Sequence, residues 1–327
     1  MNRHPRVPFD PELLDGFDRF KRDFEFELLT EQTIDSYRAR LSRGDEVLEQ
    51  VAEDHEVDVE HRSVPGPEGE PEVVLTLLRP RGGLREAACV YGIHGGGMML
   101  GDRAGALAVT LPYVLEFGCL GVVVEYRLAP EHPDPAPVED CYAGLKWVAE
   151  HAGELGVDPD RLLVIGESAG GGLSAGTALL ARDRGCPALA GQGLVCPMLD
   201  DRNSTLSSLQ HMEVGIWPGS FNETGWNALV GAEHRGTDRV SPYAAPARMQ
   251  DLSGLPPAYI EVGSAEVFRD ESVDYASRIW ATGGTAELHV WAGGFHSYYD
   301  IAPEAAVSRA TLDARRNWVA RVLGFSV

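Results

Sequence analysis

The residue of this sequence best placed to act as a nucleophile is Ser168. It is the centre of Gly166-Glu167-Ser168-Ala169-Gly170, which directly follows the apolar run Leu162 to Ile165. A strand that turns sharply into a helix leaves no room for side chains beside the turning residue, so glycines flank the turn while the serine stays exposed in a strained conformation. Ser174, the centre of a second match to this pattern, has no strand before it. We interpret Ser174 as a small residue that lets the following helix pack closely on a sheet.

The candidate base for this nucleophile is His296. A serine hydroxyl is a weak nucleophile and needs a base within hydrogen-bond reach. Of the ten histidines, His296 is the one in a glycine-containing loop, Trp291 to His296, directly after the last predicted strand. Loops that follow parallel strands meet at the carboxyl edge of the sheet, where the turn at Ser168 should also lie. We therefore expect His296 to reach Ser168.

A run of three glycines offers a site for developing negative charge. The segment His94-Gly95-Gly96-Gly97 follows a predicted strand that ends at Ile93. Successive glycines let the backbone approach a substrate and point several N–H groups toward one oxygen, which suits the stabilisation of a tetrahedral oxyanion. A phosphate-binding loop is the alternative, but no Lys-Ser/Thr pair follows and Met98 to Leu100 are apolar. His94 is expected to position the loop rather than to transfer a proton.

The elements that would position these residues alternate between strands and helices. Strands are predicted at residues 72–78, 87–93, 122–124, 162–165, 193–196, 258–262 and 286–290, and helices at 136–151, 271–281 and 305–323. The continuous apolar runs among the strands are typical of strands covered on both faces. The fold class predicted is therefore α/β, with a mostly parallel, doubly wound sheet and helices on both faces.

Two segments do not fit this alternation and could cover a pocket. Residues 10–55 carry an apolar stripe at helical spacing, which could pack on its own domain or roof an apolar pocket. Residues 200–235 lie between two core strands and are much longer than a simple connection, which favours a lid insertion. The stripe consists of Leu13, Phe17, Phe20, Phe24 and Leu28, and the insertion contains Trp217 and Trp226. We divide the chain into N-terminal helices at 1–55 and a main domain at 56–327 with a lid insertion at about 200–235.

The charge of the chain argues against several classes of partner. The 327 residues carry a formal net charge of −22. A field of this sign repels phosphate backbones and anionic lipid surfaces, so we expect no nucleic-acid binding and no stable membrane association. The apolar region Leu107 to Val124 is interrupted by polar residues and is interpreted as a helix followed by a strand rather than a membrane span.

The cysteines and the N-terminus indicate in which cellular compartment the protein is expected. The five cysteines are an odd number without metal-ligand spacing, so we expect buried thiols in a reducing environment. Met1 to Pro5 lead into acidic sequence rather than an apolar signal core. We therefore expect a cytoplasmic protein. The cysteines are Cys89, Cys119, Cys141, Cys186 and Cys196.

Taken together, the motifs resemble those of the bacterial hormone-sensitive-lipase-like, or type IV, esterases of the α/β-hydrolase fold. They are His94 to Gly97, Tyr126-Arg127-Leu128-Ala129-Pro130-Glu131, Gly166 to Gly171 and the loop of His296, in the order typical of that family. The resemblance covers the chain from about residue 72 to its end. It implies an oxyanion hole formed by the N–H groups of Gly95, Gly96 and Ala169. Tyr126, Arg127, Glu131 and Asp140 are expected to brace the loop below it. The resemblance also implies that the N-terminal helices at 1–55 and the insertion at about 200–235 form a cap on an α/β-hydrolase catalytic domain at 56–327.

The triad acid departs from the usual pattern of this family. Where the family carries Asp-Pro-Leu-Arg-Asp, this chain has Glu266-Val267-Phe268-Arg269-Asp270. Glu266 lies in the loop after the predicted strand, whereas Asp270 falls where the next helix begins and has a structural role available at the helix N-terminus. We predict that Glu266 is the acid, since glutamate is accepted there in this fold, with Asp270 as the alternative. Glu167 is expected to be structural.

The function expected is that of a serine carboxylesterase or lipase-like hydrolase acting on short- to medium-chain acyl esters through an acyl-enzyme intermediate. Its partner is a small-molecule ester, and neither a metal nor a cofactor is expected. The pocket is predicted to include Phe17, Phe20, Trp217 and Trp226. An amidase or peptidase on the same fold and a non-catalytic ligand-binding protein on a hydrolase scaffold are the alternatives. The family resemblance also suggests a homodimer joined through an edge strand.

Overall fold

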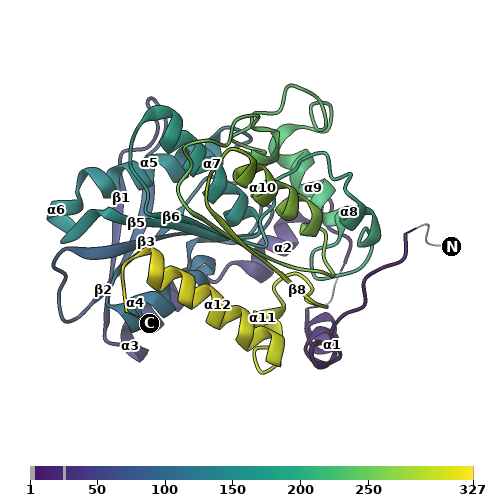
Figure 1. Ribbon diagram of the computed structural model, residues 1–327, viewed down its shortest axis with the longest axis horizontal. Helices are drawn as coiled ribbons and strands as arrows, with labels where there is room; N and C mark the ends of the chain where they lie inside the picture. Colours follow the sequence, from purple (N-terminus) through teal and green to yellow (C-terminus); the bar gives the residue numbers. More distant parts are fainter. Residues whose placement is uncertain (1–3, 25–26, 327) are drawn as a thin grey trace.

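A single eight-stranded sheet forms the centre of the computed structural model, which describes residues 4–24 and 27–326 (Figure 1). The strand order is β1-β2-β4-β3-β5-β6-β7-β8. β2 runs antiparallel to both β1 and β4, whereas the strands from β4 to β8 pair in parallel. The strands are β1 (Val57–Val64), β2 (Val73–Pro80), β3 (Ala87–Ile93), β4 (Leu120–Glu125), β5 (Val157–Glu167), β6 (Gly191–Val195), β7 (Ala258–Gly263) and β8 (Ala286–Trp291).

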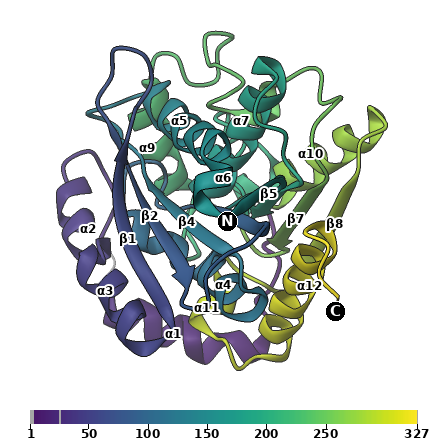
Figure 2. The ribbon, with the colours of Figure 1, turned by 90° about the vertical axis from the view of Figure 1, so that its left-hand side faces the viewer.

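Helices cover both faces of this sheet (Figures 1 and 2), which confirms the predicted α/β class. Helices α5, α7 and α10 lie on one face, and α4 and α12 lie on the other. The α-helices are α1 (Leu14–Asp23), α2 (Ile34–Leu41), α3 (Gly44–Asp54), α4 (Leu111–Phe117), α5 (Ala136–Glu150), α6 (Ala152–Leu155), α7 (Ala169–Arg184), α8 (Leu206–Gln210), α9 (Gly219–Val230), α10 (Arg269–Ala281), α11 (Tyr298–Ile301) and α12 (Ala306–Val322), and the 3-10 helices are η1 (Pro11–Leu13), η2 (Arg103–Val109) and η3 (Pro246–Arg248).

The register of the parallel strands aligns the loops that carry the candidate site. Ile93 of β3 lies opposite Gly166 of β5, and Gly263 of β7 lies opposite Trp291 of β8. The glycine run, the turn at Ser168 and the later loops therefore all leave the sheet at its carboxyl edge, as the sequence predicted.

Helix α7 follows Ser168 and packs unusually closely on its surroundings. A Cβ on Gly176 would lie 2.2 Å from the carbonyl oxygen of Tyr243, so only glycine fits there. Ser174 is fully buried, and its hydroxyl donates a hydrogen bond to the carbonyl of Gly170, 2.8 Å away. This matches the interpretation of Ser174 as a helix-packing residue.

The first strand of the sheet is the main element that the sequence patterns missed. β1 precedes the strand predicted at residues 72–78, and its interior positions are exposed or half-buried. It lies at the edge of the sheet and lacks the apolar run that identified the other strands. β5 also begins earlier than predicted, because residues 157–161 form a polar first half of that strand.

The N-terminal segment and the cysteines required smaller corrections. The helical pattern over residues 10–55 is divided among η1, α1, α2 and α3, with residues 25–26 outside the described part. Residues 1–3, on which the expectation about a signal peptide partly rests, also lie outside it. Cys186 is exposed, whereas the other four cysteines are buried as expected. Within the described residues, none of the helices has the length and apolar character needed to cross a membrane.

Candidate active site

Ser168 occupies a strained turn between β5 and α7. Its backbone has φ 58° and ψ −120°, an unusual conformation for a residue with a side chain. A Cβ on Gly166 would lie 2.2 Å from the carbonyl oxygen of Gly170, and one on Gly170 would lie 2.1 Å from that of Ile93. The glycines are therefore required because the turn presses against its own backbone and against β3. The N–H of Ser168 donates to the carbonyl of Val195, 2.8 Å away, which ties the turn to β6.

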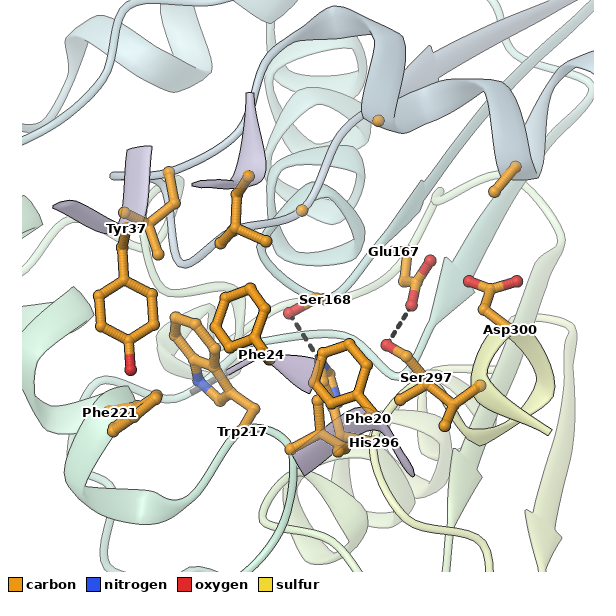
Figure 3. A pocket seen from close by; sticks show the side chains of 18 of the residues that line it. Phe20, Phe24, Tyr37, Glu167, Ser168, Trp217, Phe221, His296, Ser297 and Asp300 are labelled. Atoms are coloured by element: carbon orange, nitrogen blue, oxygen red, sulfur yellow. Dashed lines mark hydrogen bonds between the residues drawn. The ribbon is translucent and has the colours of Figure 1, made fainter. Parts of the chain in front are cut away.

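His296 and Glu266 form a hydrogen-bonded chain with Ser168. The Nε2 atom of His296 lies 3.0 Å from Oγ of Ser168 (Figure 3). On the other side of the ring, Nδ1 lies 2.7 Å from Oε2 of Glu266, while Oε1 accepts the N–H of Gly263 at 2.9 Å. The side chains of Ser168, His296 and Glu266 are all buried. An ionised carboxylate at Nδ1 favours the tautomer in which Nε2 is free to accept the serine proton.

Asp270, the alternative acid, is used elsewhere. One carboxylate oxygen accepts the N–H of Ser207 at 2.8 Å, and the other accepts from Nε of Arg269 at 2.7 Å. Asp270 lies in the first turn of α10, where it also complements the helix dipole. The structure thus brings Glu266, and not Asp270, into contact with His296.

The glycine run lies directly beside Ser168. A Cβ on Gly95 would lie 3.2 Å from Cβ of Ser168, and both Gly95 and Gly96 line the same cavity as the serine. Ala169 begins helix α7, where N–H groups have no partner within the helix. The Nδ1 atom of His94 lies 2.8 Å from the carbonyl oxygen of Gly95, in keeping with a positioning role.

A side chain at Gly96 should lower activity by displacing the loop, and this loss should exceed the one that reduced stability would cause. Gly96 has φ +102°, and a Cβ there would lie 2.2 Å from the carbonyl oxygen of Leu100. Gly96→Ala must therefore displace the loop, and we expect kcat to fall by roughly 10²- to 10³-fold, as for the loss of one oxyanion donor. Gly118→Ala is the matched control, since Gly118 also has positive φ but open space around it. Equal losses of kcat in the two variants would contradict the inference that the position of the glycine run determines kcat.

Arg38 is a candidate positioning residue that sequence reasoning missed. From α2 it donates to the carbonyl of Met99 at 2.9 Å and to that of Ala129 at 2.8 Å, and it pairs with both oxygens of Glu131 at 2.7 Å. The N-terminal segment is thus tied to the backbone that follows the glycine run. An arginine in a polar helical stripe gives no sequence signal for such a contact.

Three of the expected bracing residues, Tyr126, Arg127 and Asp140, make contacts where β4 ends. The hydroxyl of Tyr126 donates to the carbonyl of His94 at 3.0 Å, and the two rings stack at 4.2 Å. Arg127 holds Asp140 through two charged hydrogen bonds of 2.8 Å. These contacts fix the end of β4 against β3 and α5.

A cavity of about 270 Å³ opens onto Ser168 and His296. Phe20 and Trp217 line it as predicted. Phe17 and Trp226 are not among its lining residues: the Phe17 ring packs against Phe295 at 5.1 Å, and Trp226 is fully buried. Both were assigned to the pocket from their aromatic character, but they contribute to the packing behind it. The structure adds Phe24, Tyr37, Leu41, Ile216 and Phe221 to the apolar wall (Figure 3).

One group of possible metal ligands overlaps this site. Cys196, Glu266 and His296 each place one ligand atom within 4.8 Å of the others. Both ring nitrogens of His296 already have partners in Ser168 and Glu266. The hydroxyl of Tyr299 lies 3.7 Å from Sγ of Cys196. These contacts suit a hydrogen-bonded chain better than a metal centre.

Comparisons with known proteins agree with this architecture. Residues 90–300 match a family model described as the alpha/beta hydrolase fold. The carboxylic ester hydrolase LipN of Mycobacterium tuberculosis is 34% identical over 279 residues, which cover 81% of this chain and 72% of LipN. Among solved structures, a bacterial heroin esterase is 35% identical, with a TM-score of 0.87 over 96% of this chain and 98% of that one. A hyperthermophilic esterase from the archaeon Pyrobaculum calidifontis is 30% identical, with a TM-score of 0.82 over 97% and 99%.

Proposed function

Because this chain belongs to the α/β-hydrolase family, in its hormone-sensitive-lipase-like group of carboxylic ester hydrolases, we propose that it cleaves short- to medium-chain acyl esters with a Ser168-His296-Glu266 triad. The observation that carries this proposal is the buried chain of hydrogen bonds from Ser168 Oγ to Glu266. It ends in a cavity lined mainly by apolar side chains.

The proposed reaction proceeds through an acyl-enzyme. His296 Nε2 takes the hydroxyl proton while Ser168 Oγ attacks the ester carbonyl, and Glu266 stabilises the imidazolium that forms. The N–H groups of Gly95, Gly96 and Ala169 stabilise the oxyanion. His296 then returns the proton to the leaving alcohol. Water, deprotonated by the same nitrogen, attacks the acyl-enzyme, and the serine leaves with its proton restored.

We also propose that the two predicted cap segments form the acyl-binding wall. Tyr37 comes from the N-terminal helices, whereas Trp217 and Phe221 come from the insertion, and all three line the cavity beside Ser168. The rings of Trp217 and Phe221 meet edge to face at 6.0 Å, and those of Tyr37 and Phe221 at 5.8 Å. A cavity of about 270 Å³ is just below the roughly 300–1,000 Å³ of typical ligand pockets, which favours short acyl groups.

The test is a chain-length profile with p-nitrophenyl esters from acetate to decanoate. We expect kcat/KM to be highest for short chains and to fall for decanoate. Trp217→Ala should shift the preference toward longer chains, raising the octanoate-to-butyrate ratio by roughly tenfold, the scale of one or two methylenes in an apolar pocket. Trp280→Ala, at an exposed position on α10 outside the cavity, is the control. An unchanged profile in Trp217→Ala would exclude this wall as the acyl site.

A further inference from the structure

The cavity at Ser168 has two chemically different sides (Figure 3). Aromatic rings form one side, on which we place the acyl group. Carboxylates and a hydroxyl form the other, so they face the leaving alcohol of an ester bound in this way. The aromatic side includes Tyr37, Trp217 and Phe221, and the acidic side includes Glu167, Ser297 and Asp300.

The acidic side has negative charge available for a ligand. The hydroxyl of Ser297 donates a hydrogen bond to Glu167, and the Glu167 carboxyl group faces Asp300. Within the described residues, no hydrogen bond or ion pair engages the Asp300 carboxylate, and Asp300 keeps exposed surface at the cavity. Partial desolvation at the cavity wall and the charge of Glu167 raise the pKa of Asp300 to about 7. A cation between the two carboxylates would relieve this repulsion.

The cations already near this side do not remove that charge. Arg315 lies behind it and is paired with the buried carboxylate of Glu261. Arg43 lines the cavity and offsets part of the charge of Asp300, whose pKa it lowers, but among the described residues it forms no ion pair with Asp300 or Glu167. The net charge of −22 would raise the local concentration of cationic ligands.

We propose that the acidic side of the cavity, formed by Glu167, Ser297 and Asp300, binds a cationic nitrogen in the alcohol part of the substrate. The preferred substrates are then esters of amino alcohols. This inference rests on the proposed esterase function and assigns Asp300 as a specificity-determining residue.

The test compares two esters of the same shape, acetylcholine and 3,3-dimethylbutyl acetate, in which a carbon replaces the charged nitrogen. At pH 8 we expect the wild-type kcat/KM to be roughly tenfold higher for the cationic ester, as for one charge-assisted contact. Asp300→Asn should reduce this ratio to about twofold, since only Glu167 then remains. Asp313→Asn, an equal charge change at an exposed position on α12, should keep the wild-type ratio.

The pH dependence of the ratio gives a second readout. Asp300 is ionised only above its raised pKa, so the preference for the cationic ester should grow as pH rises from 6 to 8. The groups that act on its charge are Glu167 and Glu261, which raise the pKa, and Arg43 and Arg315, which lower it. Effects on the triad cancel, because both esters use the same catalytic groups. In Asp300→Asn the ratio should not change over this range.

Each outcome separates this inference from the proposed function. If 3,3-dimethylbutyl acetate is hydrolysed in a Ser168-dependent manner but acetylcholine is no better a substrate, the cation site is wrong and the esterase stands. If neither ester is hydrolysed, the proposed function fails. Arg43→Gln keeps the test decisive if Asp300→Asn does not fold, because Arg43 is exposed. Loss of this positive charge should raise the ratio, and an unchanged or lower ratio would overturn the inference.

Discussion

Ser168→Ala is expected to lower kcat for p-nitrophenyl butyrate by roughly 10⁴- to 10⁶-fold, the scale seen when a triad nucleophile is removed. In the structure Oγ of Ser168 is the atom that faces both Nε2 of His296 and the cavity. Removing it leaves the base and the backbone donors but no group to form the acyl-enzyme. Burst-phase kinetics should show loss of the p-nitrophenol burst, and a fluorophosphonate probe should no longer label the protein.

Ser174→Ala is the matched control for this prediction. Ser174 lies at the centre of the second Gly-x-Ser-x-Gly match, but its hydroxyl bonds to the carbonyl of Gly170 inside α7. Its loss should cost about 1 kcal/mol of stability and leave the burst in place. Turnover that persists in Ser168→Ala, or a burst that disappears only in Ser174→Ala, would show that the nucleophile was assigned to the wrong turn.

The core of the fold could be predicted because the inner parallel strands, such as β3, β4, β6 and β7, are buried on both faces. The strand predicted at residues 87–93 coincides with β3, and the strand and helix signals on either side of Ser168 have their counterparts in β5 and α7. β1 could not be predicted in the same way. Among the described residues it pairs with β2 alone, and its interior positions are exposed or half-buried, so it carries neither a continuous apolar run nor a clear alternation.

The same distinction applies to the candidate site: residues with a local sequence signal could be predicted, and residues placed by long-range packing could not. Ser168, His296 and the glycine run follow strand ends, and their placement depends only on the sheet having a carboxyl edge. The wall of the cavity depends on which face of a cap segment turns inward. Phe17 and Phe20 belong to one stripe, yet only Phe20 lines the cavity, because Phe17 is held by Phe9 and Phe295. No periodicity distinguishes two such neighbours.

Glu266→Gln is expected to lower kcat by roughly 10³- to 10⁴-fold, as for loss of a triad carboxylate. The reason lies in its two hydrogen bonds, since Oε1 accepts the N–H of Gly263 and Oε2 meets Nδ1 of His296. An amide has one acceptor oxygen. If that oxygen stays with Gly263, the amide NH₂ faces Nδ1 and forces the tautomer in which Nε2 carries the proton and cannot accept one from Ser168. If the amide turns over, its NH₂ opposes the N–H of Gly263.

Asp270→Asn tests the competing assignment in the same assay. The Asp270 carboxylate binds the N–H of Ser207 and pairs with Arg269, so its loss should act on stability. We expect kcat to change within roughly threefold, while thermal unfolding shifts to lower temperature. Steady-state kcat and thermal midpoints of both variants, measured together, separate the two roles. A larger loss of kcat in Asp270→Asn than in Glu266→Gln would mean that the acid reaches His296 from helix α10, and that the contact between Glu266 and His296 is structural.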